Sequence, residues 1–478
     1  MSFSQSTSPG LLPIPGYRPL PFFGGRLDAL RFFSDPIGHL VRLEREFGPV
    51  ASFAAGSSSF VCVFGAENNR VVLSDPATFN HYLALPFRIP RNSPASRIFD
   101  NILAMNGERH KRYRRVLMPV VNKAAVSAHA PAVVRMTRDF LRRWKADKPL
   151  PIVLEMGELI MRVSTHCLFG VEPTTQTTPI GPLSLRLLGL LSSPWTIVFP
   201  VNLRGTHYAG FLETTERIEA VLRKLIQEKQ NAAGADVLSR LIEFRDDDGS
   251  KLDDHEIIAL STSMLFGGQD ALTNTLTWAL VLLSQHAGVL DRLQAEIDDV
   301  LRGEEPTESV LPQMPWLDSV VQETMRILPP IVHSMFRRAT STTRIGRHEI
   351  KEGSVIVVSP FNMHRNPDLY PNPQRFDPER WSRLTPGPYE YMPFGAGPRM
   401  CIGVGFSAMV VRFQLAMILQ RFRPVLPENT RIDYLVRAAN LGAKEAIPLY
   451  LVDRRQTMRS SAPVQGSIRQ LVDFPGGF

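Results

Sequence analysis

The chain has 478 residues, 44% of them hydrophobic, with a mean hydropathy of −0.06, so it can bury a large core. Lys and Arg (54) exceed Asp and Glu (46) by a modest formal charge of +8, and basic and aromatic residues do not interleave as in single-strand binders, so we expect no nucleic-acid partner. Only three cysteines occur, far apart in sequence, which excludes a disulfide framework and any metal site that needs four thiolates.

The N-terminal stretch MSFSQSTSPGLLPIPGYRPLPFFGG has neither a basic start followed by an apolar run nor about 20 consecutive apolar residues. We therefore expect no export signal, no membrane anchor and a cytoplasmic protein. Composition stays even from Pro36 to Val452, which favours one large domain. We assign residues 1–35 to a Pro-rich N-terminal segment, 36–452 to the domain, and 453–478 to a polar, loosely held tail.

Periodicity predicts few strands and many helices. Alternating or continuous apolar runs bounded by small residues indicate strands, and apolar residues at helical spacing indicate helices. In chain order we expect strands at 50–55 and 60–65, helices at 132–146 and 214–230, a long helix at 253–301, a strand at 354–359, a helix at 409–422 and a weaker strand at 447–452. The fold class is thus mainly α with a small β-sheet region built from both ends of the chain.

The segment NGERHKRYRRVLMP (106–119) places His110 and Arg114 one turn apart at the start of an expected helix. A charged, solvated helix face explains its other cations equally well, namely Arg109, Lys111, Arg112 and Arg115.

The segment MLFGGQDALTN (264–274) places two glycines, Gly267 and Gly268, in the middle of the longest expected helix. Two glycines inside a helix cost roughly 2 kcal/mol relative to alanine, so something should require them. Close packing of a crossing helix is one explanation. Asp270 follows the pair, and Ala271 follows Asp270.

The segment ETMR places Glu323 and Arg326 three residues apart on one helix face, where opposite charges can pair. The spacing alone means little, because Glu67 with Arg70 and Glu428 with Arg431 share it, and we interpret those as ordinary surface pairs. Glu323 differs through its long downstream context, which includes LPPIVHSMFRR, KEG and PER.

The segment FGAGPRMCIG (394–403) surrounds Cys401 with three glycines and an arginine, ahead of a helical run. Glycines let the backbone approach a flat ligand, and a following helix offers N–H groups and the positive end of its dipole to a thiolate. Arg399 can clamp a carboxylate in bidentate fashion. An isolated buried cysteine is usually only a small apolar residue, but this joint pattern is more specific.

The pattern F-G-x-G-x-R-x-C-x-G resembles the haem-binding loop of the cytochrome P450 family, and the other motifs follow in that family's order from Pro36 to Val452. The resemblance implies haem b as cofactor, with Cys401 as the axial thiolate and metal ligand. It also implies a buried charge network of Glu323, Arg326 and Arg380. The other cofactor-binding residues it implies are Arg399, Arg337, His110, Arg114, Phe394, Gly395 and Gly403.

On the central helix, the resemblance implies that Gly267 and Gly268 open a groove for dioxygen, with Asp270 as the acidic residue. The family then has a threonine whose hydroxyl relays protons, whereas this chain has Ala271. Three readings stay open: a substrate hydroxyl substitutes, Thr273 or an ordered water substitutes, or the reaction needs no ordinary oxygen activation.

The resemblance therefore implies a monooxygenase that oxidises a hydrophobic small molecule, such as a terpenoid or polyketide secondary metabolite. We expect substrate-pocket residues at Phe266, Ile331, Val332, His333, Asn440 and Leu441. The expected partners are dioxygen and a separate electron donor, of the ferredoxin and ferredoxin reductase or the flavodoxin type, and the chain should be a monomer. The alternatives are a peroxygenase or a rearranging or desaturating enzyme, because of Ala271, and a haem carrier or sensor.

Overall fold

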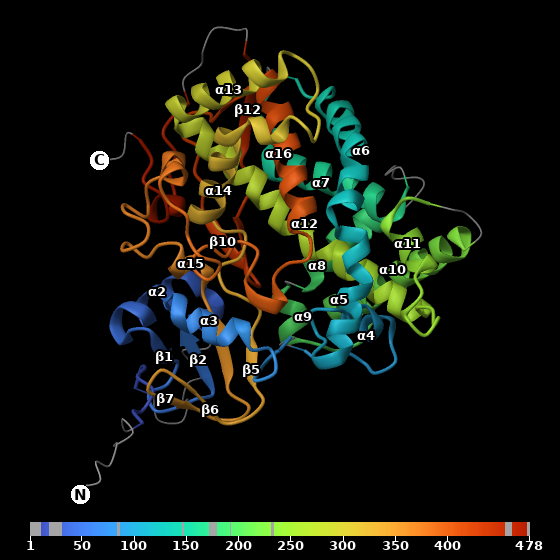
Figure 1. The fold of residues 1–478 in the computed structure, drawn as a ribbon, viewed down its shortest axis with the longest axis vertical. Coiled ribbons are helices and arrows are strands. Elements are labelled where there is room, and N and C mark those ends of the chain that lie inside the picture. Colours follow the sequence, from blue (N-terminus) through green and yellow to red (C-terminus); the bar gives the residue numbers. More distant parts are fainter. Residues whose placement is uncertain are drawn as a thin grey trace, which may run out of the picture. The chain divides into compact units, whose positions relative to one another are not determined.

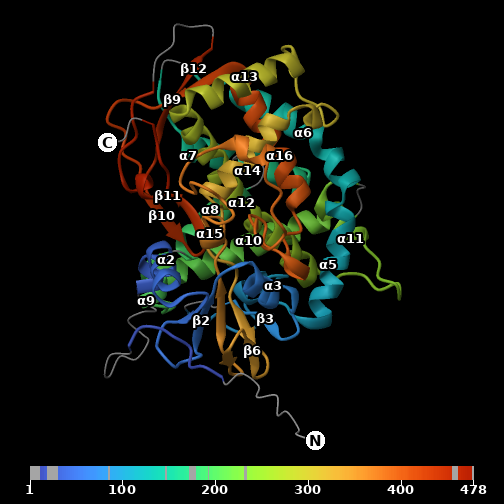
Figure 2. The same cartoon turned by 60° about the vertical axis from the view of Figure 1, so that its left-hand side comes forward.

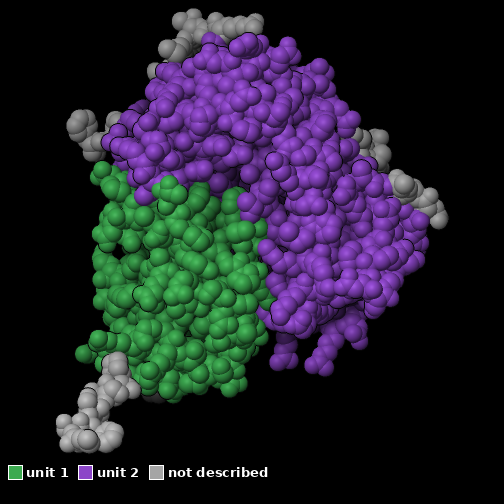
Figure 3. Space-filling model, viewed as in Figure 1, with its two compact units in different colours: residues 1–84, 331–373, 385–401 green, residues 85–330, 374–384, 402–478 purple. Residues whose placement is uncertain are grey.

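The structure is a computed structural model that describes residues 11–18, 31–83, 87–145, 148–171, 179–191, 193–230, 234–454 and 461–475 (Figure 1). Much of the predicted N-terminal segment therefore lies outside the described residues, as do positions 455–460 and 476–478 of the predicted tail. Contacts divide the chain into two compact units, coloured separately in Figure 3. Unit 1 contains residues 1–84, 331–373 and 385–401, and unit 2 contains residues 85–330, 374–384 and 402–478.

Unit 1 is built on a mixed five-stranded sheet with strand order β1-β2-β8-β5-β3. Its strands are β1 (Val50–Ser52), β2 (Phe60–Val63), β3 (Phe79–His81), β5 (Arg337–Ala339) and β8 (Val355–Val358). A hairpin of β6 (Thr343–Ile345) and β7 (His348–Ile350) adds a second sheet. The helices are α2 (Pro36–Phe47), α3 (Ala66–Ser74), α15 (Pro360–Met363) and the 3₁₀ turn η3 (Gly397–Arg399).

The sheet joins the two ends of the chain, as the sequence predicts. Strands β2 and β8 are parallel, with Val61 opposite Ile356 and Val63 opposite Val358. These four side chains are fully buried. Parallel strands are covered on both faces, which is why both segments read as continuous apolar runs rather than alternating ones.

Unit 2 is mainly helical. Its helices are α4 (Pro94–Phe99), α5 (Gly107–Val121), α6 (Lys123–Leu141), α7 (Ile152–Phe169), α8 (Ile180–Leu191), α9 (Pro194–Val198), α10 (His207–Lys229), α11 (Val237–Glu243), α12 (Asp254–Gln285), α13 (Ala287–Leu301), α14 (Pro315–Ile327) and α16 (Val404–Arg421), with 3₁₀ turns η1 (Leu311–Gln313), η2 (Pro378–Ser382) and η4 (Ser467–Gln470). Strands β4 (Leu150–Pro151), β12 (Pro448–Asp453) and β9 (Phe422–Val425) form one antiparallel sheet, and β10 (Tyr434–Arg437) and β11 (Asn440–Ala443) form a hairpin. None of the described helices combines the length and hydropathy needed to span a bilayer.

Helix α12 lies among α7, α14 and α16 (Figures 1 and 2). It begins with a capping box, in which the Asp253 carboxylate accepts from the Glu256 N–H at 2.8 Å and Glu256 accepts from the Asp253 N–H at 3.0 Å. From Leu272 to Ser284 every side chain is buried, including polar ones such as Thr273 and Asn274.

The predicted continuous helix 253–301 is wrong, because the chain breaks at His286 between α12 and α13. His286 leaves the helical region (φ −121°), and its ring lies 5.0 Å from Phe376 and 6.1 Å from Phe474. Both aromatic partners lie far away in sequence. The apolar periodicity reports only local helical spacing, so it continues through His286 and does not reveal the break.

The predicted loose tail is also wrong for residues 461–475. Five of its apolar side chains are buried, namely Val464, Ile468, Leu471, Val472 and Phe474. The Asp473 N–H donates to the Gln374 carbonyl at 2.8 Å, and the Gln374 amide donates to the Gln470 carbonyl at 2.9 Å. We call residues 461–475 the C-terminal strap.

Candidate functional site

The cysteine loop of unit 1 has the bent backbone that its glycines predict. Gly395 and Gly397 both have φ of +71°, the left-handed region that favours glycine. At Gly397 a Cβ would lie 2.3 Å from the Leu73 carbonyl oxygen, so α3 also requires a glycine there. Gly403 differs, because its φ of −86° is open to any residue. The Cys401 N–H donates to the Phe394 carbonyl at 2.8 Å, which closes the loop.

The three cysteines differ in environment. Cys401 is exposed, whereas Cys62 and Cys167 are buried in apolar surroundings. Burial raises the pKa of the Cys62 thiol far above its usual value and raises that of Cys167 to about 12. Since a metal ligand must be the thiolate, Cys401 alone of the three suits that role.

Unit 1 holds two arginines that suit an anionic ligand. Burial, together with the positive charge of Arg399, lowers the pKa of Arg337 to about 9. The Nε of Arg337 is buried and has no hydrogen-bond partner among the described residues. A carboxylate supplied from outside the protein would satisfy that donor and offset the repulsion between the two cations. These residues fit a cofactor that carries carboxylates.

Helix α5 separates its cations into two groups. His110 is buried and Arg114 is half-buried. The neighbouring cations instead form ion pairs: Arg109 with Asp100, Lys111 with Glu108, Arg112 with Asp246 and Glu256, and Arg115 with Asp247. The predicted charged face therefore exists, and His110 and Arg114 lie apart from those pairs. Their contact with a cofactor remains a prediction.

The predicted charge network lies within unit 2. Glu323 and Arg326 are fully buried and Arg380 is 6% exposed. Glu323 accepts two hydrogen bonds from Arg326, both at 2.9 Å, and one from Arg380 Nε at 3.0 Å. A buried carboxylate is stable only when it is paired in this way.

Three further groups complete the network, and the sequence did not predict them. Glu323 also accepts from the Asp377 N–H at 2.9 Å and from Trp381 Nε1 at 3.1 Å. The Arg375 carbonyl accepts from Nη2 of Arg326 at 3.2 Å and of Arg380 at 3.4 Å. The C-terminal strap contacts this segment, because the backbones of Arg375 and Asp473 form an isolated parallel β-bridge. Two of these groups belong to the backbone, which is the same in every residue and cannot be predicted from a motif. Only Trp381, which follows PER in the sequence, could have been predicted.

The two comparison pairs are on the surface, as predicted. Glu67 and Arg70 are exposed on α3, and Glu428 and Arg431 are exposed outside any helix. Arg431 forms its ion pair with Asp433, at 2.7 Å, rather than with Glu428 as expected. Without a helix, an i,i+3 spacing does not bring two side chains together.

The two glycines on α12 do not serve helix packing. A Cβ built on Gly267 meets no atom within 4 Å among the described residues, and one on Gly268 meets only Leu272, at 3.8 Å on the same helix. The explanation by a crossing helix is therefore wrong. The glycines leave space open beside a helix that is buried from Leu272 to Ser284.

Asp270 is half-buried on α12. Burial raises the pKa of its carboxyl group, and the positive charge of Arg437 on the hairpin β10-β11 opposes that rise. The carboxyl group therefore keeps its proton to a higher pH than an exposed aspartate does, which suits a group that holds and releases protons.

Thr273 does not lie beside Ala271. Residues two apart on a helix point about 200° apart around its axis. The Thr273 side chain is buried toward α7, where its Oγ1 would lie 4.0 Å from a Cβ on Gly157. The Gly157 carbonyl on α7 accepts from the Gln269 side chain at 3.3 Å. The Thr273 hydroxyl has no hydrogen-bond partner among the described residues, and it faces α7 rather than the side of the helix on which Ala271 lies.

The expected pocket residues fall into both units. In unit 1, Ile331 is half-buried, Val332 is fully buried, and His333 stacks on Phe336 at 5.3 Å while its Nδ1 lies 2.9 Å from the Ser334 carbonyl. In unit 2, Phe266 and Asn440 are half-buried, and Leu441 is buried with its carbonyl accepting from Trp278 Nε1 at 3.0 Å. Contact of these residues with a substrate remains a prediction.

Comparisons with known proteins assign the family. The family model for cytochrome P450 matches residues 14–442, which span both units. Cyclooctat-9-en-7-ol 5-monooxygenase of Streptomyces melanosporofaciens is 28% identical over 88% of this chain and 90% of its own, and sterol 14alpha-demethylase of Mycolicibacterium vanbaalenii is 25% identical over 86% and 92%. The solved structure of cyanobacterial CYP120A1 with bound retinoic acid matches 93% of this chain and all of its own, at 23% identity and a TM-score of 0.81. The chain therefore belongs to the cytochrome P450 family and is a monooxygenase with a haem-thiolate cofactor.

Proposed function

We propose that the enzyme inserts one oxygen atom into a hydrophobic small molecule of secondary metabolism that carries a hydroxyl group. The observation that carries this proposal is the open space beside Gly267, on a helix that is fully buried from Leu272 to Ser284. Two bacterial relatives support the substrate class, since their names specify an alcohol, cyclooctat-9-en-7-ol, and a sterol. These names favour a terpenoid over a polar metabolite.

Each unit has its own role in this proposal. Cys401 would hold the iron as a thiolate, and Arg337 and Arg399 would bind the cofactor's carboxylates. When bound, the haem supplies the oxidising chemistry that reacts with unactivated carbon. The network around Glu323 positions the segment that contains PER, and His110 with Arg114 supplements the carboxylate binding. A separate ferredoxin or flavodoxin-type donor supplies electrons. Monomeric state and cytoplasmic location remain predictions.

The substrate's hydroxyl has a specific task in this proposal. Ala271 cannot hold a proton or a water molecule, and the Thr273 hydroxyl is buried toward α7. Burial raises the pKa of the Asp270 carboxyl group, which suits it to exchange protons, but relay geometry tolerates little error, so a second hydroxyl must stand close to it. A substrate hydroxyl, or a water that it orders, meets this need only when the correct substrate is bound.

The test compares an apolar alcohol that the enzyme turns over with its deoxy analogue, measured as product formed per reducing equivalent. We expect the alcohol to be coupled roughly tenfold better than the analogue, with the difference lost as peroxide. Ala271→Thr should restore coupling with the analogue, whereas Ala271→Val adds the same bulk without a hydroxyl and should not. Thr273→Val should change neither ratio. Equal coupling of both compounds in the unmodified enzyme contradicts substrate assistance.

Ala271 also favours a second candidate, a haem-thiolate peroxygenase or rearranging enzyme that needs no proton relay. This candidate predicts product formation with peroxide, or with no oxidant at all, when the electron donor is omitted. The first proposal predicts that turnover stops without the donor.

A further inference from the structure

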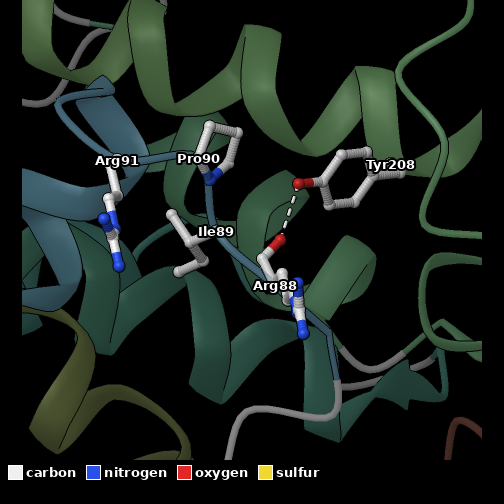
Figure 4. A pocket seen from close by; sticks show the side chains of 5 residues that line it. All are labelled: Arg88, Ile89, Pro90, Arg91 and Tyr208. Carbon is white, nitrogen blue, oxygen red and sulfur yellow. Dashed lines mark hydrogen bonds between the residues drawn. The ribbon is translucent and has the colours of Figure 1, made fainter.

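A pocket of about 610 Å³ lies in unit 2, where the segment before α4 meets the start of α10 (Figure 4). The segment Arg88–Arg91 and the Tyr208 side chain line it. A pocket of this volume accommodates a small molecule. A protein or a bilayer would instead require a broad exposed surface.

The pocket has a defined shape, because neighbouring side chains hold its lining segment. The Tyr208 hydroxyl donates to the Arg88 carbonyl at 2.7 Å (Figure 4), and the Ser93 hydroxyl donates to the Pro90 carbonyl at 2.7 Å. Tyr208 is itself fixed, since it is 5% exposed and its ring centroid lies 5.8 Å from that of Phe87. These two carbonyl groups are thus satisfied within the protein, and the arginine side chains remain available to a ligand.

The two arginines of the pocket are not neutralised by the protein. Arg88 and Arg91 are exposed, and in Figure 4 their guanidinium groups extend to the same side of the segment, with Ile89 between them. Within the described part of the chain, neither of them forms an ion pair. Arg97, on the helix that follows, by contrast pairs with Glu219 at 2.9 Å. The local fold therefore pairs one cation and leaves two at the pocket.

The surroundings of the two arginines favour an anionic group on an apolar body. Neither chain segment that forms the pocket contributes an acidic residue, since positions 76–99 and 173–212 have none. Two guanidinium groups at one pocket repel each other, and a carboxylate bound between them offsets that repulsion. Ile89, Pro90 and the Tyr208 ring provide apolar walls.

The pocket adjoins an apolar cluster that also reaches the neighbourhood of Gly267. Ile89 packs against a buried cluster of unit 2 that includes Phe87 and Leu265. Phe266, which precedes Gly267 and is an expected substrate-pocket residue, packs against the same cluster. Apolar residues of one cluster therefore connect the arginine pocket with the open space beside Gly267.

We propose that Arg88 and Arg91 bind a carboxylate at one end of the substrate, while the apolar body of the substrate lies along this cluster toward Gly267. Arginine suits this task, because its planar group forms charge-assisted and often bidentate hydrogen bonds with a carboxylate. This inference rests on the proposed function and narrows its substrate to an apolar hydroxy acid. A phosphate ester offers the same chemistry, so the test includes one.

The test measures binding of terpenoid acids to the full-length, haem-loaded enzyme by equilibrium dialysis. Abietic acid and farnesoic acid are each compared with the methyl ester and with the phosphate ester of the corresponding alcohol. We expect each acid to bind roughly tenfold tighter than its methyl ester, because the ester cannot form charge-assisted hydrogen bonds. The difference should shrink with added salt, since the arginines are exposed. Acids that bind no tighter than their esters, or do not bind, overturn the proposal. Phosphate esters that bind tighter than the acids overturn the assignment to a carboxylate.

A pair of double variants separates the pocket from general charge attraction. Arg88→Gln with Arg91→Gln should abolish the preference for the acids and leave the affinity for the esters within about twofold. The matched control, Arg217→Gln with Lys251→Gln, removes the same charge from exposed positions of unit 2 outside the pocket and should keep the preference. Equal preferences in the two double variants would show that the pocket is not the anion site. Slower reduction by an acidic ferredoxin in the first variant, with unchanged affinity for the acids, would assign the arginines to the electron donor instead.

Failure of the anion site differs from failure of the role proposed for the substrate's hydroxyl. Acids without any preference, together with better coupling of the alcohol than of its deoxy analogue, exclude the anion site alone. Equal coupling of those two compounds, together with an acid preference that Arg88→Gln with Arg91→Gln abolishes, excludes only the hydroxyl's role in proton delivery and supports the anion site.

Discussion

Cys401 differs from the other two cysteines in a way that a simple substitution can test. It is exposed, while burial raises the thiol pKa of Cys62 and Cys167. Cys401→Ser should abolish the strongly red-shifted Soret band of the reduced carbon monoxide complex, which reports a thiolate ligand. Cys62→Ala and Cys167→Ala should keep that band, even where they lower stability. A band that persists in Cys401→Ser would contradict the assignment.

Asp270 makes stability depend on pH. Burial raises the pKa of its carboxyl group above the ordinary value of 3.8. An acid whose pKa is raised by folding stabilises the protein below its unfolded pKa, and that contribution is lost as pH rises through the folded pKa. Asp270→Asn should therefore remove a fall in thermal midpoint that the unmodified enzyme shows above about pH 4.

Arg437 provides the control for Asp270, because its positive charge opposes the rise in pKa. Arg437→Gln should extend the fall in thermal midpoint to higher pH, and the effect should vanish when Asp270→Asn is also present. Midpoints measured from pH 4 to pH 8 in all four proteins form a double-mutant cycle. Parallel pH profiles in the four proteins would show that Asp270 does not titrate as the structure implies.

At the same scale, local patterns predicted local geometry. The glycines of the cysteine loop and the pairing of Glu323 with Arg326 follow from residues close in sequence, and both are confirmed. Helix geometry alone could also have excluded Thr273 as a neighbour of Ala271. The carbonyl of Arg375 could not be predicted, because every residue has a carbonyl and only the fold selects one.

At the scale of elements, predictions failed where packing between distant segments decides the structure. Strands are present at all four expected places, 50–55, 60–65, 354–359 and 447–452, because burial in a sheet requires apolar runs in the sequence, but the first strand already ends at Ser52. The break at His286 and the C-terminal strap both depend on Phe474, nearly 190 residues after the break. The strap was predicted to be loose because most of its residues are polar. Its few large apolar side chains are nevertheless buried.

The strap should stabilise the site through the segment that contains Arg375. Phe474 is 6% exposed and packs near His286, which also contacts Phe376. Phe474→Ala should therefore lower the free energy of unfolding by about 3 kcal/mol. It should also speed haem loss, because the Arg375 carbonyl accepts from both arginines of the network.

The matched control is Phe199→Ala, which truncates an exposed phenylalanine of the same unit and should change stability by less than about 0.5 kcal/mol. Glu323→Ala sets the upper limit, since it leaves two buried arginines without their carboxylate and should cost about 3 to 5 kcal/mol. Transfer of haem to an apo-globin acceptor measures the loss rates. If Phe474→Ala unfolds more easily yet releases haem at the unmodified rate, the strap only stabilises unit 2.

At the scale of the whole molecule, the formal charge of +8 favours an acidic electron donor. Attraction between opposite charges speeds encounter and is screened when ions are added, so reduction by an acidic ferredoxin should slow several-fold between about 50 and 300 mM salt. Photochemical reduction without a protein donor should not change.

Arg70→Glu tests where the charge acts, because Arg70 is exposed on α3, the helix that packs against the cysteine loop at Gly397. Arg344→Glu makes the same change in net charge on the hairpin β6-β7. We expect Arg70→Glu to slow reduction more than Arg344→Glu does. Salt screens charges that lie more than a Debye length of about 10 Å from the donor, so a charge at the contact site attracts it most strongly. Equal rates for the two variants would mean that net charge alone steers the donor, and a rate independent of salt would exclude an acidic donor surface.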